Sequence, residues 1–398
     1  MKYAAFILGF FFNSWYMLEV FQLPVAGVSF IYLVIAGVLL ILTKPETVKV
    51  HGRFILFISL FLLFFLISFP FFNKSAYSYY KFMMIFAKVP ALTMIPFFLG
   101  KNFRSFFWGY VVALMMLVLL LTLTWSRVAT EATTVNSRIG VGVLNPIWIS
   151  RLIFEMILVS AMILKIGKKK LMLVIAGCLP IIYMSGSKGP IVACLIAWFL
   201  HSFRFNRSKW KVIVLGIFLL VTGYVTYLTV GLDENSYFVQ RFLRIVPDES
   251  SDDIKEESRS VVWPKTIGKL ADGSTASLLL GHGIGSFPEF YYGYHTDDRV
   301  YPHNFLLELI VEEGLLFTLF VTFCFFYFYR KAKGNFKYLF IFYFINSMFS
   351  GDIILNEQVF LYLSFMAMSK IYFNESTVSN FGELPGPGYH PVAGYKPV

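Results

Sequence analysis

The stretch that decides the fold is residues 301–329, in which Tyr301-Pro302-His303-Asn304 is followed by FLLELIVEEGLLFTLFVTFCFFYFY. The run from Phe305 to Tyr329 is long enough to cross a bilayer, since a spanning helix takes about 20 mostly apolar residues. The polar residues ahead of it are therefore expected at the mouth of a membrane span. An imidazole there can accept a proton near neutral pH, which makes His303 the first candidate catalytic residue.

The composition of the whole chain is that of a polytopic membrane protein. Hydrophobic residues make up 58% of the 398 residues and charged residues 14%, whereas a soluble domain is nearer half apolar and a quarter charged. The net charge of +11 comes from short basic clusters between apolar runs, which indicates positive-inside topology and not nucleic-acid binding. The three cysteines lie inside apolar runs and predict neither disulfides nor a zinc site.

The charged clusters divide the sequence into an all-α membrane domain with about 12 transmembrane helices. These spans are expected near residues 3–21, 23–42, 54–72, 82–99, 105–124, 146–164, 171–184, 190–203, 212–230, 304–329, 338–349 and 359–373. The first span is expected to be retained, because no signal-peptide cleavage site follows Lys2.

The distribution of Lys and Arg predicts the orientation of the domain. Basic clusters occur in alternate loops, which places both termini in the cytoplasm and the long loop 231–302 outside, in the periplasm or cell exterior. The transmembrane domain then covers residues 1–374 and includes this loop. Residues 375–398, rich in Pro and Gly, are expected to be a disordered cytoplasmic tail or a cloning remnant.

The long outer loop has three predicted parts. Residues 248–257 are an acidic run, expected to be solvated surface. Residues 258–271 have the apolar spacing of an amphipathic helix lying on the bundle, which would hold Arg259 in place. Gly281-His282-Gly283-Ile284-Gly285 is expected to form a flexible turn ahead of the histidine.

Basic side chains on the outward side are candidates for binding a diphosphate. Arg138 and Arg259 offer forked donors that are always charged. Lys188 lies at a glycine- and proline-marked break between two short apolar segments, and such breaks occur where they line a cavity. Residues 295–298 offer one His and two Asp but no carboxylate pair at helical spacing, so neither a metal nor a cofactor is expected.

Other charged residues lie within or beside the apolar runs, where a charge needs a partner or a function. Arg151 and Glu155 have the i, i+4 spacing that allows pairing on one helix face. Together with Lys88 they would also suit a transporter for a lipid-linked anion.

The histidine region resembles a known family. Tyr301-Pro302-His303-Asn304, nine residues and Gly314 are similar to the His-Asn-x9-Gly signature of the O-antigen ligase and O-antigen polymerase superfamily. Arg259-x3-Trp263 and the glycine-rich stretch 280–287 are similar to elements that precede that histidine. Residues 137–146 and 185–190 resemble basic elements nearer the N-terminus.

The resemblance implies a GT-C-like glycosyltransferase of the bacterial inner membrane. Its active site would face the periplasm or exterior, and its donor would be an undecaprenyl-diphosphate-linked glycan. The family's histidine corresponds to His303 and its loop arginine to Arg259, which are the expected catalytic residues. Many relatives have arginine where this chain has Lys188. The expected substrate-binding residues are Arg138, Lys188, Arg259, Asn304 and Glu308.

Three functions remain open at this point. A polysaccharide repeat-unit polymerase is slightly favoured, because the Tyr-Pro-His-Asn-x4-Glu stretch resembles polymerases, and a chain-length regulator protein is then a candidate partner. A ligase would use lipid A core as acceptor in place of a second glycan. A transporter predicts paired internal repeats, which the sequence does not display.

Overall fold

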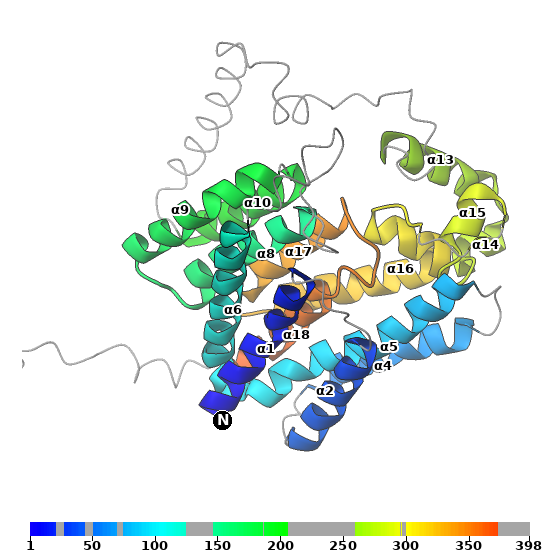
Figure 1. Cartoon of the computed structure of the whole chain (residues 1–398). Coiled ribbons are helices and arrows are strands. Elements are labelled where there is room, and N and C mark those ends of the chain that lie inside the picture. The colour runs from blue at the N-terminus through cyan, green and yellow to red at the C-terminus, as the bar shows by residue number, and fades with distance from the viewer. Residues whose placement is uncertain are drawn as a thin grey trace, which may run out of the picture.

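The computed structural model describes residues 1–20, 28–43, 51–69, 75–124, 146–185, 187–205, 259–294, 296 and 300–372. Every regular element in these ranges is helical (Figure 1), as the all-α prediction requires. The helices are α1 (Lys2–Val20), α2 (Val28–Leu42), α4 (Gly52–Ser68), α5 (Ala76–Leu99), α6 (Phe103–Leu123), α8 (Pro146–Leu158), α9 (Lys168–Ser185), α10 (Lys188–Phe205), α13 (Arg259–Asp272), α14 (Thr275–Leu280), α15 (Phe287–Tyr292), α16 (Phe305–Lys331), α17 (Phe336–Ser347) and α18 (Gln358–Tyr372).

Each predicted span within the described ranges coincides with a helix. Two helical stretches there, Ala76–Leu123 and Phe305–Lys331, are long and apolar enough to cross a membrane, and two shorter apolar helices accompany them. The total of about 12 spans stays a prediction. The predicted span 212–230, the acidic run 248–257 and the tail 375–398 lie outside the described residues.

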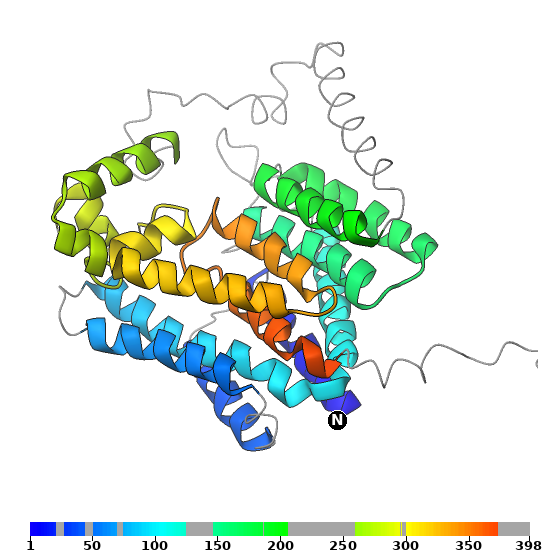
Figure 2. The ribbon, with the colours of Figure 1, turned by 180° about the vertical axis from the view of Figure 1, so that it is seen from behind.

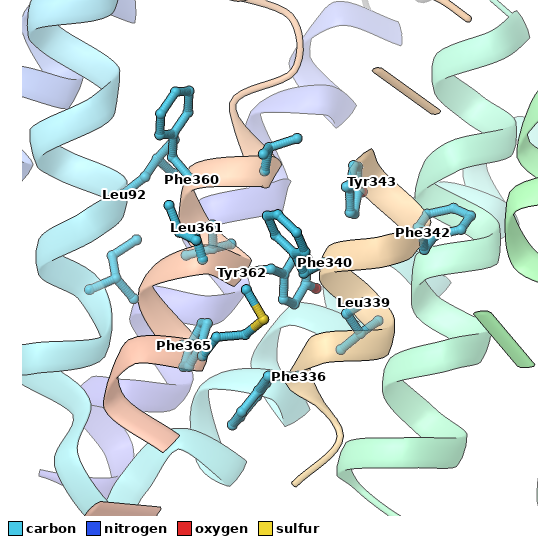
Figure 3. Close-up of a cluster of buried hydrophobic side chains, with 14 of the residues drawn as sticks. Leu92, Phe336, Leu339, Phe340, Phe342, Tyr343, Phe360, Leu361, Tyr362 and Phe365 are labelled. Carbon is cyan, nitrogen blue, oxygen red and sulfur yellow. The ribbon is translucent and has the colours of Figure 1, made fainter. Parts of the chain in front are cut away.

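Aromatic side chains fill the centre of the helical bundle. Phe336 and Tyr343 of α17 are fully buried against Phe365 and Tyr362 of α18 (Figure 3). The ring centroids are 4.8 Å apart in the Phe336–Phe365 pair and 5.5 Å apart in the Tyr343–Tyr362 pair. Close-packed aromatic pairs of this kind dominate the energetics of a core.

One face of α16 is apolar and exposed. Leu316, Leu319, Phe323 and Phe326 follow the helical repeat, and each is more than half exposed. In a membrane protein such a stripe faces the lipid tails, which are as apolar as the side chains themselves. The opposite face, which includes Phe317 and Val321, is buried in the bundle.

The three helices in the described part of the long loop gather at the N-terminal end of α16 (Figures 1 and 2). The expected amphipathic helix is confirmed as α13, which begins at Arg259 and turns Val262, Thr266 and Leu270 inward. Helices α14 and α15 follow on either side of the glycine turn. We call the whole segment, residues 259–292, the loop unit.

Candidate active site

His303 lies in the short segment that leads into α16. Its backbone has φ of 55°, which is uncommon for a residue other than glycine. The next residue, Asn304, caps the helix: its Oδ1 accepts a hydrogen bond of 3.0 Å from the N–H of Leu307, as an N-cap residue does. His303 is partly exposed, although its Nδ1 atom is buried, and its ring centroid lies 4.6 Å from that of Tyr301.

Helix α13 is attached directly beside this histidine. The indole Nε1 of Trp263 donates a hydrogen bond of 2.8 Å to the carbonyl of Pro302, the residue before His303. Arg259 lies one turn ahead of Trp263 and is exposed. The Arg259-x3-Trp263 spacing therefore brings a cation and an imidazole to the same end of α16.

A small hydrophobic cluster joins the loop unit to the first turns of α16. It contains Val262 and Leu270 of α13, Phe287 and Tyr291 of α15, and Leu307 and Val311 of α16. The ammonium of Lys269 donates to the carbonyls of Phe290 and Tyr291, at 3.2 and 2.7 Å, and so completes the C-terminus of α15. The loop unit is thus packed as part of the helical domain.

The glycine turn is bound to α16 through backbone groups. Gly281, Gly283 and Gly285 all have positive φ, at 80°, 95° and 72°. The N–H groups of His282 and Gly283 donate to the carbonyls of Val311 and Glu312, at 2.9 and 2.6 Å.

These two carbonyls need outside donors because α16 is interrupted directly after them. The span predicted over residues 304–329 is not one continuous helix, since Gly314 has φ of 83° and ψ of 167°. At such a break the preceding carbonyls lose the N–H groups of the next turn. The glycine turn replaces those lost donors.

His282, inside the glycine turn, is the one histidine of the loop unit, residues 259–292. Its ring packs on Phe290, with 4.8 Å between centroids. Burial lowers the pKa of His282, and the nearby Glu289 opposes this shift.

A buried ion cluster lies one turn further along α16. Glu308 and Glu312 are on one face of the helix, and both bind the ammonium of Lys81 in α5. The Lys81 Nζ is 2.7 and 2.6 Å from the two carboxylate oxygens of Glu312. Glu308 also accepts a hydrogen bond of 2.9 Å from the N–H of Ile353. Glu308, expected to bind substrate, is therefore buried among protein partners.

The charged residues predicted inside the apolar runs also have protein partners. Arg151 donates to the carbonyls of Asn346 and Ser350, at 2.7 and 2.9 Å. The carboxylate of Glu155 accepts hydrogen bonds from Tyr343 and Tyr362. Lys88 is paired with Glu357. Buried charges that are paired and hydrogen-bonded in this way are accounted for by the packing of the bundle.

The structure brings together some of the predicted site residues. His303, Asn304 and Arg259 lie at the N-terminal end of α16, with Glu308 buried just beyond them. Lys188 is the first residue of α10, directly after the predicted break that ends α9 at Ser185. The convergence of Lys188 and Arg259 stays a prediction.

Two sets of predicted residues cannot be placed. Arg138 lies outside the described residues, as do His295, Asp297 and Asp298. Within the described part of the chain, no group of three or more His, Cys, Asp or Glu side chains is arranged to hold a metal ion.

Comparison with known protein families gives a match over part of the chain. Residues 171–322 match the family described as O-antigen ligase. The matched region starts in α9 and ends in α16, so it contains Lys188, Arg259, the glycine turn, His303 and Gly314. No curated protein matches the chain. The resemblance to the O-antigen polymerase and ligase superfamily is thereby confirmed.

Proposed function

We propose that this chain, whose residues 171–322 match the O-antigen ligase family, polymerises undecaprenyl-diphosphate-linked polysaccharide repeat units on the outer face of the bacterial inner membrane. The repeat units would belong to an O-antigen, a capsule or an exopolysaccharide. The observation that carries the proposal is the hydrogen bond from Trp263 to Pro302, which fastens the helix that begins at the exposed Arg259 beside the partly exposed His303.

In the proposed reaction, His303 accepts the proton of the acceptor sugar hydroxyl while the hydroxyl oxygen attacks the anomeric carbon of the donor glycan. A new glycosidic bond forms, and the bond between the anomeric carbon and the diphosphate oxygen breaks. Arg259, with Arg138 and Lys188, stabilises the negative charge of the departing diphosphate. In this scheme the protein's own cations take the part that a metal ion has in many diphosphate enzymes.

Asn304 and Glu308 have different parts in the proposed site. The Oδ1 of Asn304 is used in capping α16, which leaves its amide nitrogen to donate to a sugar hydroxyl. Glu308 is 1% exposed and bound to Lys81. It would therefore contribute to substrate binding indirectly, by fixing the position of α16.

A ligase is the second candidate, favoured by the description of the matched family. It would use the same donor and the same His303, with lipid A core in place of the acceptor glycan. The geometry at the end of α16 suits both reactions. In each of them the leaving group is a polyprenyl diphosphate and the attacking group is a sugar hydroxyl.

The test is reconstitution of the purified chain in bilayers with an undecaprenyl-diphosphate-linked repeat unit. A ladder of longer lipid-linked glycans would support the polymerase. Transfer only after addition of lipid A core would establish the ligase instead. If glycan is transferred to neither acceptor, with donors from the same organism, the proposed function is wrong.

A further inference from the structure

We propose that Lys81 is a positioning residue for this site. In this proposal the cluster of Lys81, Glu308 and Glu312 fixes the His303-bearing end of α16 against the glycine turn. The proposal rests on the proposed function, because it gives the cluster a part in the reaction attributed to His303.

The first support is the burial and geometry of the cluster. The side chains of Lys81, Glu308 and Glu312 are between 0% and 3% exposed, so they do not contact solvent or a large substrate directly. Glu308 and Glu312 are one helical turn apart and converge on a single ammonium. The cluster thus clamps the part of α16 before Gly314 onto α5.

The second support is that the glycine turn is seated on the same cluster. A Cβ atom built on Gly285 would lie 2.7 Å from the Cα of Ser78, one turn ahead of Lys81 on α5. Glu312 therefore contacts α5 through its side chain and the glycine turn through its carbonyl.

The third support is the segment between α17 and α18. Glu308 accepts a hydrogen bond from the N–H of Ile353. The preceding residue, Asp352, accepts a hydrogen bond of 2.8 Å from Tyr77 of α5. Four pieces of the chain, distant in sequence, thus meet around one lysine: the start of α5, the glycine turn, the first half of α16 and the 352–353 segment.

The charge balance makes Lys81 the critical member of the cluster. Glu308 and Glu312 share one ammonium, that of Lys81. Two further carboxyl groups lie close by: Glu313 accepts a hydrogen bond from Ser68, and Asp352 accepts one from Tyr77. Without Lys81, two buried glutamates one turn apart would lose their counter-charge. Removing one partner of a buried ion pair is strongly destabilising, because the remaining charge stays buried. The first half of α16 would then move toward water and carry His303 with it.

The first experiment compares amide hydrogen exchange in the wild type and Lys81→Met, both in lipid nanodiscs. We expect exchange in residues 279–287 and 303–313 to rise by about 100-fold or more, the ratio that corresponds to loss of one buried ion partner. Exchange in α17, inside the aromatic core, should not change. The matched control is Lys88→Met, which removes a buried lysine of the same helix whose partner is Glu357. It should leave residues 279–287 protected.

The second experiment measures catalysis. With the lipid-linked donor, Lys81→Met should lower kcat by about 10- to 100-fold, the size of effect that a small misplacement of a catalytic group produces, and leave KM for the donor within about threefold. Lys81→Arg, which keeps the charge and both contacts, should recover most of kcat.

A triple variant, Lys81→Met with Glu308→Gln and Glu312→Gln, covers the case in which Lys81→Met does not fold, because it also removes the charges of the two glutamates that bind Lys81. We expect it to recover the melting temperature but not kcat.

Three results would overturn the proposal: exchange that rises throughout the chain in Lys81→Met, exchange that is unchanged at residues 279–287, or a triple variant with wild-type kcat. If the wild type transfers no glycan at all, the proposed function fails by itself, and the exchange data still decide whether Lys81 holds this end of α16.

Discussion

Gly281 and Gly314 pack backbone against backbone, and neither position has room for a side chain. A Cβ atom on Gly281 would lie 2.5 Å from the amide nitrogen of Gly314, and one on Gly314 would lie 2.2 Å from the carbonyl oxygen of Leu279. Both residues have positive φ, at 80° and 83°, a conformation that glycine adopts without strain. The glycine that ends the His-Asn-x9-Gly pattern is thus explained by a helix break and a close backbone contact.

Gly314→Ala should therefore separate the loop unit from α16. Both the backbone strain, about 1–3 kcal/mol for a non-glycine residue in such a conformation, and the steric overlap oppose the native contact. We expect a lower melting temperature and loss of glycan transfer. The control is Gly268→Ala in α13, where a Cβ meets nothing within 4 Å and alanine should favour the helix. Equal melting temperatures for the two variants would contradict this account of Gly314.

His303→Ala should abolish glycan transfer and leave expression and membrane insertion intact. The side chain is partly exposed and lies before the first turn of α16, so its removal takes little from the packing of the bundle. The measurement is glycan transfer by the purified variant. The control is His282→Ala, which changes the histidine of the glycine turn and should stay active. A His303→Ala enzyme with the wild-type rate would remove His303 from the mechanism.

Arg259 and Lys188 should respond differently to exchange of one basic side chain for the other. Arg259→Lys replaces two directed hydrogen bonds by a point charge, and a charged hydrogen bond contributes about 1.5–3 kcal/mol, so donor use should fall by about 10- to 150-fold. Lys188→Arg introduces the arginine that the family resemblance implies at this position and should be tolerated. Steady-state rates at varied donor concentration test both variants. Full activity of Arg259→Lys together with an inactive Lys188→Arg would show that the assigned roles are wrong.

The orientation of the long loop can be tested by labelling. A cysteine at Ser251, which lies outside the described residues, is introduced after replacement of Cys178, Cys194 and Cys324. It should react with a membrane-impermeant maleimide in spheroplasts, because the distribution of basic residues places loop 231–302 outside. Reaction only after the inner membrane is broken would show that the loop lies on the cytoplasmic side, opposite to the prediction.

The helices could be predicted from the sequence because their signal is local. A bilayer-length apolar run, as in residues 305–329, or an amphipathic repeat, as in α13, is visible within one segment. The motif residues His303 and Arg259 could also be predicted to lie together, since the resemblance groups them.

The ion cluster and the helix break could not be predicted in the same way. Lys81 falls just ahead of the span predicted over residues 82–99, and its partners Glu308 and Glu312 lie more than two hundred residues away in sequence. Their i, i+4 spacing inside an apolar run was the one available signal that a buried cation would face them. A single glycine in an apolar run, such as Gly314, is normally tolerated within a helix, so only the structure reveals that it ends the helical hydrogen bonding.

The attachment of the glycine turn has a consequence for how such a protein can diversify. The turn is held by main-chain donors, main-chain acceptors and glycines, and main-chain groups are the same whatever residues a loop carries elsewhere. Sequence on either side of the turn can therefore change over evolutionary time while the main-chain contacts of the turn with α16 are kept. The same reasoning gives protein engineers a rule for exchanging these loops between relatives: the graft should begin and end outside residues 281–285.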